Sequence, residues 1–374
     1  MRLGVPKETR AGERRVALIP DTVRSLADRG IEVVVEAGAG AAAGHPDVQY
    51  TDAGATIGDP WGANIVVAVA PPTVGEIGRI GPGKVLIGFL APLTAVETTK
   101  ALAAGGITSF AVEAIPRITR AQAMDALSSQ ANVAGYAATL LAAREAGRFF
   151  PMMTTAAGTV SPAKVLVLGA GVAGLQAIAT AKRLGAVVTG FDIRRAAWEQ
   201  IRSLGGRPLE LDFIPDAEDE SGYARPLTEE ENERVREALA ESAGRQDVII
   251  TTALIPGRPA PILITRAGVE NMAPGAVIVD LAGESGGNCE LTEAGGTIVH
   301  GGVKVIAPAN LASDMAAHAS QLYAKNLENL IGLITSEEGE LALDFDDEVV
   351  AGACLTHGGE IRNERARSVV EGSA

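Results

Sequence analysis

Residues 164–185 read KVLVLGAGVAGLQAIATAKRLG, and this stretch decides the fold. An apolar run over residues 165–168 predicts a strand, and LQAIATAKRLG predicts a helix. Between them lies a GxGxxG turn made of Gly169, Ala170, Gly171, Val172, Ala173 and Gly174. Such a turn lets the backbone approach a pyrophosphate, and the N-terminus of the following helix supplies N–H groups and partial positive charge. The stretch therefore predicts a dinucleotide-binding α/β domain.

The next predicted strand, AVVTGFD, ends in Asp192 and is followed by Ile193 and Arg194. A carboxylate about 20 residues beyond the glycines accepts hydrogen bonds from the adenosine ribose hydroxyls. It also repels a 2′-phosphate, so Asp192 favours NAD over NADP, although Arg194 and Arg195 leave NADP open. We predict that residues 169–174 and 192–194 bind the cofactor.

Short β-branched runs alternate with helical patterns along the rest of the chain, which predicts parallel sheets in two doubly wound, Rossmann-like domains. One set of strands runs from RLGV to ITSFAVEA and the other from KVLVLGAG to VKVIAPAN. Long helices are predicted over residues 121–147 and 313–334, with a ligand cleft between the domains. We expect an N-terminal domain over residues 1–126, completed by 315–374, and an NAD(H)-binding domain over 127–314.

The acidic stretch 214–244 is longer than a doubly wound fold needs as a connection. It is expected to be either a solvated excursion or a mobile lid. Tyr223 lies within it beside Gly222, a pattern that suits a loop tip.

Composition excludes several classes of protein. A formal charge of −14 disfavours a nucleic-acid surface. The two cysteines, Cys289 and Cys354, lie outside any CxxC pattern, so neither a disulfide framework nor a metal site is expected. Apolar runs such as VLIGFLAPL are too short to cross a membrane, and the opening MRLGVPKETR does not resemble a secretory signal.

Beyond these patterns, nearly the whole chain resembles the NAD(H)-binding domain I of proton-translocating nicotinamide nucleotide transhydrogenases and, more distantly, alanine dehydrogenases. The resemblance is carried by VPKETRAGERRVALIP, PRITRAQAMDALSSQANVAGY, FPMMTTAAGTVSPAKVLVLGAGVAGLQAIATAKRLGA, ITTALIPGRPAPILIT and VIVDLAGESGGN.

The resemblance implies site residues outside the glycine turn. PRITRAQAMDALSS looks like the transhydrogenase loop that faces the nicotinamide half of NAD(H), which implies catalytic and binding roles for Arg117, Gln122 and Asp125, and a binding role for Ser128. Gln122, Asp125 and Ser128 fall about one turn apart and are expected to share one helical face. Further nucleotide contacts are expected from Tyr223, Ala253 and Leu254.

The resemblance also distinguishes the dehydrogenation of a small substrate from hydride exchange between two nicotinamides. A small-substrate dehydrogenase needs a positioned acid or base, and alanine dehydrogenases look to have a lysine and a histidine where this chain has Ala68 and Ala91. Arg15 remains from their substrate-binding string, and a structural role for it is favoured. Hydride exchange between two nicotinamides needs no such groups.

The resemblance therefore implies the NAD(H)-binding subunit of a Si/Re-specific, proton-translocating NAD(P) transhydrogenase. NADP(H) would be held on a beta subunit, because the first turn of the N-terminal domain has no second GxGxxG. A membrane-spanning proton channel would complete the enzyme, which would be active only when assembled. We expect a homodimer in the cytoplasm, attached peripherally to the inner membrane through its partners. An alanine dehydrogenase-like enzyme and an NAD-responsive module without turnover stay open as alternatives.

Overall fold

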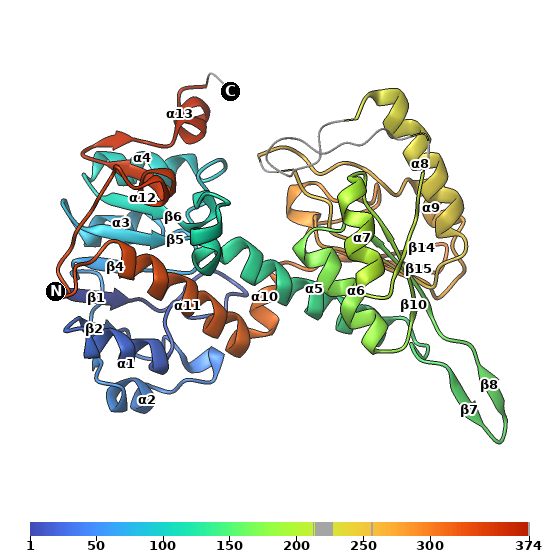
Figure 1. Cartoon of the computed structure of the whole chain (residues 1–374), viewed down its shortest axis with the longest axis horizontal. Coiled ribbons are helices and arrows are strands. Elements are labelled where there is room, and N and C mark those ends of the chain that lie inside the picture. The colour runs from blue at the N-terminus through green and yellow to red at the C-terminus, as the bar shows by residue number, and fades with distance from the viewer. Residues whose placement is uncertain (212, 214–226, 256, 373–374) are drawn as a thin grey trace. The chain divides into compact units, whose positions relative to one another are not determined.

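The computed structural model describes residues 1–211, 213, 227–255 and 257–372. The chain divides into two units, of which the first comprises residues 1–130 and 312–374 and the second residues 131–311. Each unit contains its own sheet (Figure 1). The two units are described separately below.

The sheet of the first unit has the order β17-β16-β6-β5-β4-β1-β2-β3. Its parallel part consists of β1 (Arg2–Val5), β2 (Glu32–Val35), β3 (Thr56–Ile57), β4 (Ile65–Val67), β5 (Val85–Gly88) and β6 (Thr108–Ala111). Near the C-terminus, β16 (Cys354–His357) pairs antiparallel with β6, and β17 (Glu360–Ile361) pairs with β16. The C-terminal segment thus extends a sheet that the N-terminal residues begin.

Both faces of this sheet are buried. On β4, Ile65 and Val67 join one apolar cluster while Val66 joins another, as expected when successive side chains point to opposite faces. This explains why the strands read as continuous apolar runs and not as alternating ones. The helices of the unit are α1 (Pro20–Asp28), α2 (Asp47–Asp52), α3 (Val74–Ile80), α4 (Val96–Ala104), α10 (Leu311–Asp314, which starts in the second unit), α11 (Ala316–Leu333), α12 (Glu348–Ala353) and α13 (Glu364–Val370).

The sheet of the second unit has the order β11-β10-β9-β12-β13-β15-β14. Its strands are β9 (Lys164–Leu168), β10 (Val187–Phe191), β11 (Arg207–Pro208), β12 (Val248–Thr251), β13 (Val277–Asp280), β14 (Thr297–His300) and β15 (Val303–Ile306), of which only β14 runs antiparallel to its neighbour among the described residues. Its helices are α5 (Ala126–Glu145, which starts in the first unit), α6 (Val172–Arg183), α7 (Arg195–Ser203), α8 (Glu229–Ala243) and α9 (Arg266–Glu270).

The prediction of two parallel-sheet, Rossmann-like α/β domains is confirmed. In the second unit, the chain order reverses at β9, which has β10 on one side and β12 on the other. Ligands of such sheets bind at the carboxyl ends of the strands beside this reversal. The GxGxxG turn directly follows β9 and therefore lies at that point.

The stretch 214–244, which was expected to be a solvated excursion or a mobile lid, is described by the structure over residues 227–244. Its second part forms α8, which begins with a capping box in which the Glu231 N–H donates to Thr228 Oγ1 at 3.2 Å. Val235, Leu239 and Ala243 lie four residues apart and are buried in the core of the unit. The earlier part, including Tyr223, lies outside the described residues.

A two-stranded hairpin, β7 (Met153–Thr155) and β8 (Gly158–Val160), was not anticipated. Residues 151–160 are all exposed, and the hairpin extends away from the rest of the second unit (Figure 1).

Candidate functional site

The glycine turn after β9 is held by contacts that admit no side chain at two of its glycines. Gly169 has φ +89°, and a Cβ there would lie 2.8 Å from Thr252 Oγ1. At Gly174 a Cβ would lie 1.8 Å from the carbonyl oxygen of Gly169, so α6 and β9 approach each other through this glycine. Gly171 differs, because a Cβ there meets nothing within 4 Å. Open space above a helix N-terminus is the space that a pyrophosphate needs.

Asp192, at the end of β10, is 8% exposed and binds the glycine turn directly. Its Oδ2 accepts from the Ala170 N–H at 2.8 Å and from Arg194 Nη2 at 2.9 Å. Its Oδ1 accepts from the backbone N–H and from Nε of Arg194, both at 2.9 Å. Each carboxylate oxygen thus has two donors, which fills its capacity. A ribose hydroxyl that binds Asp192 must displace part of the Arg194 side chain.

The loop after β12 forms a wall beside the glycine turn. Thr252 donates its N–H to the Leu168 carbonyl at 2.8 Å and its hydroxyl to the Gly169 carbonyl at 3.0 Å. This brings the Ala253 nitrogen within 3.1 Å of where a Cβ of Gly169 would stand. The structure therefore gathers the glycine turn, Asp192 and Ala253 at one edge of the sheet, with Leu254 half exposed next to them.

The expected site residues of the first unit lie before and at the start of α5. Arg117 and Gln122 are exposed, and Gln122 belongs to a 3₁₀ helix, Thr119–Met124. The expectation that Gln122, Asp125 and Ser128 share one helical face is wrong, because Asp125 has ψ 86° and separates the 3₁₀ helix from α5. A helix needs an N-cap at this point, and Asp125 provides it.

The cap formed by Asp125 leads to a testable expectation. Its Oδ1 accepts the Ser128 N–H at 2.9 Å and its Oδ2 accepts the Ser128 hydroxyl at 2.6 Å. Asp125→Ala should lower the unfolding free energy by about 1 kcal/mol, whereas Asp125→Asn retains a capping oxygen and should change it by less than about 0.5 kcal/mol. Denaturant unfolding of the three proteins measures the difference. Equal losses in both variants would contradict capping as the origin of the stability.

Arg15 takes part in a buried ion pair of the first unit. Its Nε and Nη2 donate to the two carboxylate oxygens of Glu13 at 2.8 and 2.6 Å, and its Nη1 donates to Gln130 Oε1 at 2.9 Å. The Glu13 side chain is 1% exposed and that of Arg15 10%. A fork that holds a buried carboxylate in this way is a structural element of the unit.

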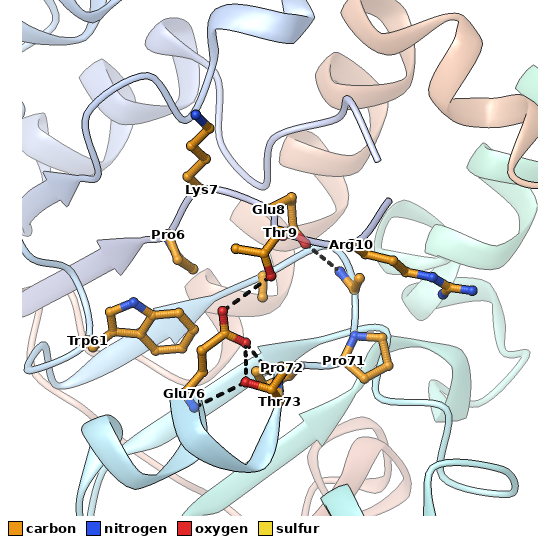
Figure 2. Close-up of a pocket in the computed structure, with 12 residues that line it drawn as sticks. Pro6, Lys7, Glu8, Thr9, Arg10, Trp61, Pro71, Pro72, Thr73 and Glu76 are labelled. Carbon is orange, nitrogen blue, oxygen red and sulfur yellow. Dashed lines mark hydrogen bonds between the residues drawn. The ribbon is translucent and has the colours of Figure 1, made fainter. Parts of the chain in front are cut away.

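A pocket of about 240 Å³ opens at the carboxyl ends of β1 and β4 (Figure 2). In Figure 2, Trp61 lies beside Glu76, whereas the Lys7 side chain points away from both. Thr9 donates its hydroxyl to Glu76 Oε1 at 3.3 Å. Glu8 accepts the N–H groups of Val69 and Ala70 at 2.6 and 3.2 Å. These side chains cap strand and helix ends, so the polar lining is accounted for by the fold.

Burial raises the pKa of Glu8 from 4.5 to about 7, against the opposing effect of its two backbone hydrogen bonds. The folded chain therefore keeps a proton that the unfolded chain loses at lower pH. The stability that this proton contributes is complete below pH 4.5 and is lost as the pH rises through 7.

Because the pKa of Glu8 is higher in the folded chain than in the unfolded chain, we expect the unfolding free energy to fall between pH 5 and pH 7. Glu8 alone should account for about 2 kcal/mol of this fall. Glu8→Gln removes the ionisable group and should flatten the profile by that amount. Urea unfolding at several pH values measures both slopes. Identical slopes in the two proteins would show that Glu8 does not titrate in this range.

Neither position where alanine dehydrogenases look to have an acid or base carries an ionisable group here. The Ala68 carbonyl accepts the Tyr323 hydroxyl at 2.8 Å. Ala91 has φ +49°, and its N–H donates to Glu113 at 2.6 Å. Burial raises the pKa of the Glu113 carboxyl as well. Sequence reasoning missed Glu8 and Glu113, since nothing in their local patterns shows that they fold back over strand ends.

Comparison with known proteins places this geometry in a family. The model described as the alanine dehydrogenase/PNT N-terminal domain matches residues 4–134, and that of the C-terminal domain matches residues 138–364. The chain belongs to the alanine dehydrogenase/PNT family. Members of this family include nicotinamide-nucleotide oxidoreductases of both kinds considered above.

Within the alanine dehydrogenase/PNT family, the chain is similar to transhydrogenase subunits. It is 48% identical to the first of the separate parts of NAD(P) transhydrogenase subunit alpha of Rhodospirillum rubrum, over 96% of this chain and 97% of that one. A solved transhydrogenase structure from Sinorhizobium meliloti matches with a TM-score of 0.88 and 46% identity, over 96% of this chain and all of that one. Alanine dehydrogenase of Mycobacterium tuberculosis is 34% identical over 77% of this chain and 74% of its own. The resemblance seen in the sequence is thereby confirmed.

Membrane spans and metal sites are both absent from the part of the chain that the structure describes. No helix among these residues is long and apolar enough to cross a membrane. In the same residues, no group of three or more His, Cys, Asp or Glu side chains is placed to hold a metal ion.

Proposed function

We propose that the chain is the NAD(H)-binding subunit of a proton-translocating NAD(P) transhydrogenase, which exchanges hydride with NADP(H) held on a partner subunit. The observation that carries the proposal is the complete nucleotide turn with Asp192, in a chain whose Ala68 and Ala91 offer no acid or base. NAD(H) is then a substrate, and the open space at Gly171 suits its pyrophosphate.

Transhydrogenation is compatible with alanine at positions 68 and 91, because it needs no acid or base there. Oxidation of an amino acid moves a proton as well as a hydride and needs a positioned acid or base. In transhydrogenation, one nicotinamide loses the hydride that the other gains, so the protein has only to align two rings with their reacting carbons about 3–3.5 Å apart. Arg117, Gln122, Asp125 and Ser128 are proposed to serve the nicotinamide half of NAD(H), and Tyr223 to contact the nucleotide.

The proposed partners are an NADP(H)-binding beta subunit and a membrane-spanning proton channel, through which this subunit attaches peripherally at the cytoplasmic side of the inner membrane. Activity would require all of them. The transhydrogenase relatives support this arrangement, because their names describe alpha subunits or pieces of them.

A reconstitution experiment tests the function. The purified chain is mixed with an NADP(H)-binding partner domain, and hydride transfer from NADH to an NADP analogue is followed optically. We expect transfer that depends on both proteins. NADH oxidation that depends on pyruvate and ammonia would instead establish an alanine dehydrogenase, and NADH binding without either reaction would establish a sensor.

We also propose that the subunit is a homodimer that pairs through residues 132–160 of the second unit. Six of the fifteen large apolar side chains that are exposed among the described residues lie here: Tyr136, Leu140, Phe149, Met152, Met153 and Val160. Residues 126–143 and 149–163 contain no charged side chain, although the whole chain carries −14. Repulsion between two copies that each carry a formal charge of −14 is smallest where carboxylates are few. Pairing about a twofold axis would bury this surface, on the hairpin and on α5, in both copies.

Sedimentation velocity tests the dimer with matched variants. Met152→Glu combined with Met153→Glu should convert a dimer to monomers, because charges would enter an apolar contact. Val299→Glu is the control, since Val299 is 66% exposed on β14. A wild-type monomer, or equal effects of both changes, would argue against this interface and leave the surface to a different subunit.

A further inference from the structure

The loop after β13 is folded back by one buried carboxylate. Asp280 is fully buried, and its Oδ1 accepts the Thr251 hydroxyl and the Ala282 N–H at 2.8 and 2.9 Å. Its Oδ2 accepts the N–H groups of Asn288 and Cys289 at 2.7 and 3.0 Å, and the Thr292 hydroxyl at 2.6 Å. Five donors from three segments fix the course of residues 281–292, and with it the backbone of Asn288.

The Asn288 side chain, which is also fully buried, then reaches the loop after β12. Its Oδ1 accepts the Ala253 N–H at 3.0 Å, and its Nδ2 donates to the Ala253 carbonyl at 2.9 Å. The remaining Nδ2 hydrogen is directed to the Pro261 carbonyl at 2.8 Å. A single amide thus pairs with both backbone groups of Ala253, as a neighbouring strand would do.

Ala253 is the residue that borders the glycine turn, as its 3.1 Å approach to the Gly169 position shows. Its loop carries Leu254, whose side chain is 51% exposed beside the turn. Neither Asn288 nor Asp280 can touch a nucleotide, because both are 0% exposed. The Asn288 side chain bonds Ala253 and Pro261, and of these two Ala253 borders the glycine turn. An influence of Asn288 on the nucleotide therefore passes through the position of Ala253.

We infer that Asn288 is a positioning residue. It holds the backbone of Ala253 and Leu254, in the loop after β12, in the position from which this loop contacts bound NAD(H). The inference rests on the proposed nucleotide site of the second unit. Without the amide, the N–H and the carbonyl of Ala253 both lose their partner, and the loop is free to shift, so the contacts between loop and nucleotide weaken. Asp280 acts one step further back, by placing Asn288.

The experiment compares Asn288→Ala with Thr251→Val by NADH titration, at a temperature where circular dichroism shows both to be folded. Thr251→Val is the matched control, because it removes one bond of the same buried network and leaves Ala253 untouched. We expect the dissociation constant for NADH to rise about tenfold or more in Asn288→Ala and less than about twofold in Thr251→Val. At saturating NADH, hydride transfer with a partner domain should stay within about twofold of wild type in both variants.

Wild-type affinity in Asn288→Ala, or an equal loss in the control, would overturn the inference while leaving transhydrogenation by the wild type unaffected. Conversely, a wild type that binds NADH but transfers no hydride would refute the proposed function alone. Should Asn288→Ala not fold, hydrogen exchange of the wild type decides. The Ala253 N–H should be protected before NADH is added, and rapid exchange there would overturn the inference.

Discussion

Gly174→Ala is expected to abolish measurable NADH binding and to lower the unfolding free energy by about 3 kcal/mol, a large but attested cost of forcing a methyl group into a close contact. The new methyl carbon would stand 1.8 Å from the Gly169 carbonyl oxygen, which is backbone and cannot rotate away. β9 and α6 must then separate, and the N–H groups at the start of α6 move away from the pyrophosphate. Loss of two charge-assisted hydrogen bonds weakens binding by more than about 100-fold.

Gly171→Ala is the matched control for this effect. Gly171 has φ −76° and an extended backbone, and a Cβ there meets nothing within 4 Å. The variant should therefore unfold within about 0.5 kcal/mol of wild type. Its methyl group nevertheless enters the space that the pyrophosphate needs, so the affinity for NADH should still fall by about tenfold or more. Calorimetric titration and denaturant unfolding separate the two effects. Unchanged binding in Gly171→Ala would show that the nucleotide does not bind at this turn.

Gln122→Asn is expected to slow hydride transfer on the order of 100-fold while leaving NADH affinity within about twofold. The change removes one methylene from an exposed side chain of the 3₁₀ helix that precedes α5. Hydride transfer depends steeply on the approach of the two rings, so a displacement of about 1 Å is sufficient for such a loss. Single-turnover kinetics with a partner domain, together with NADH titration, measure the two quantities.

The same chemical change at Gln200, which is exposed on α7, serves as the control and should affect neither quantity. Weakened NADH binding in Gln122→Asn would assign this side chain to anchoring the nucleotide instead of aligning the rings. Transfer at the wild-type rate would exclude it from the reaction altogether.

Local patterns were sufficient for much of the fold. The apolar run before Gly169 and the helical pattern after Gly174 specify β9, the turn and α6, because strand, turn and helix each have their own periodicity or dihedral requirement. The same reasoning places Asp192 at the end of the next strand, where the structure has it beside Ala170. The antiparallel strands β14 and β16 were missed, since each is short and its partner is found only in the folded sheet.

The candidate site shows the limit of such reasoning at individual residues. Gln122, Asp125 and Ser128 have the spacing of one helical face, yet Asp125 interrupts the helix because its carboxylate competes for the backbone and caps α5. Residues three apart in the sequence lie on one helical face only if the helix that contains them is continuous. An acidic residue ahead of an apolar run was the available signal for the cap.

The amino-acid sequence by itself determined the α/β class, the position of the glycine turn and the place of Asp192 after the next strand, because these depend on neighbours within one strand, turn and helix. Tertiary structure alone decided the pairing of Arg15 with Gln130, of Glu8 with Val69, and of Asn288 with Ala253, which lie 115, 61 and 35 residues apart. Hydrogen bonds of this kind form only after the strands are ordered in the sheet. Their donors and acceptors therefore leave no periodic trace in the sequence.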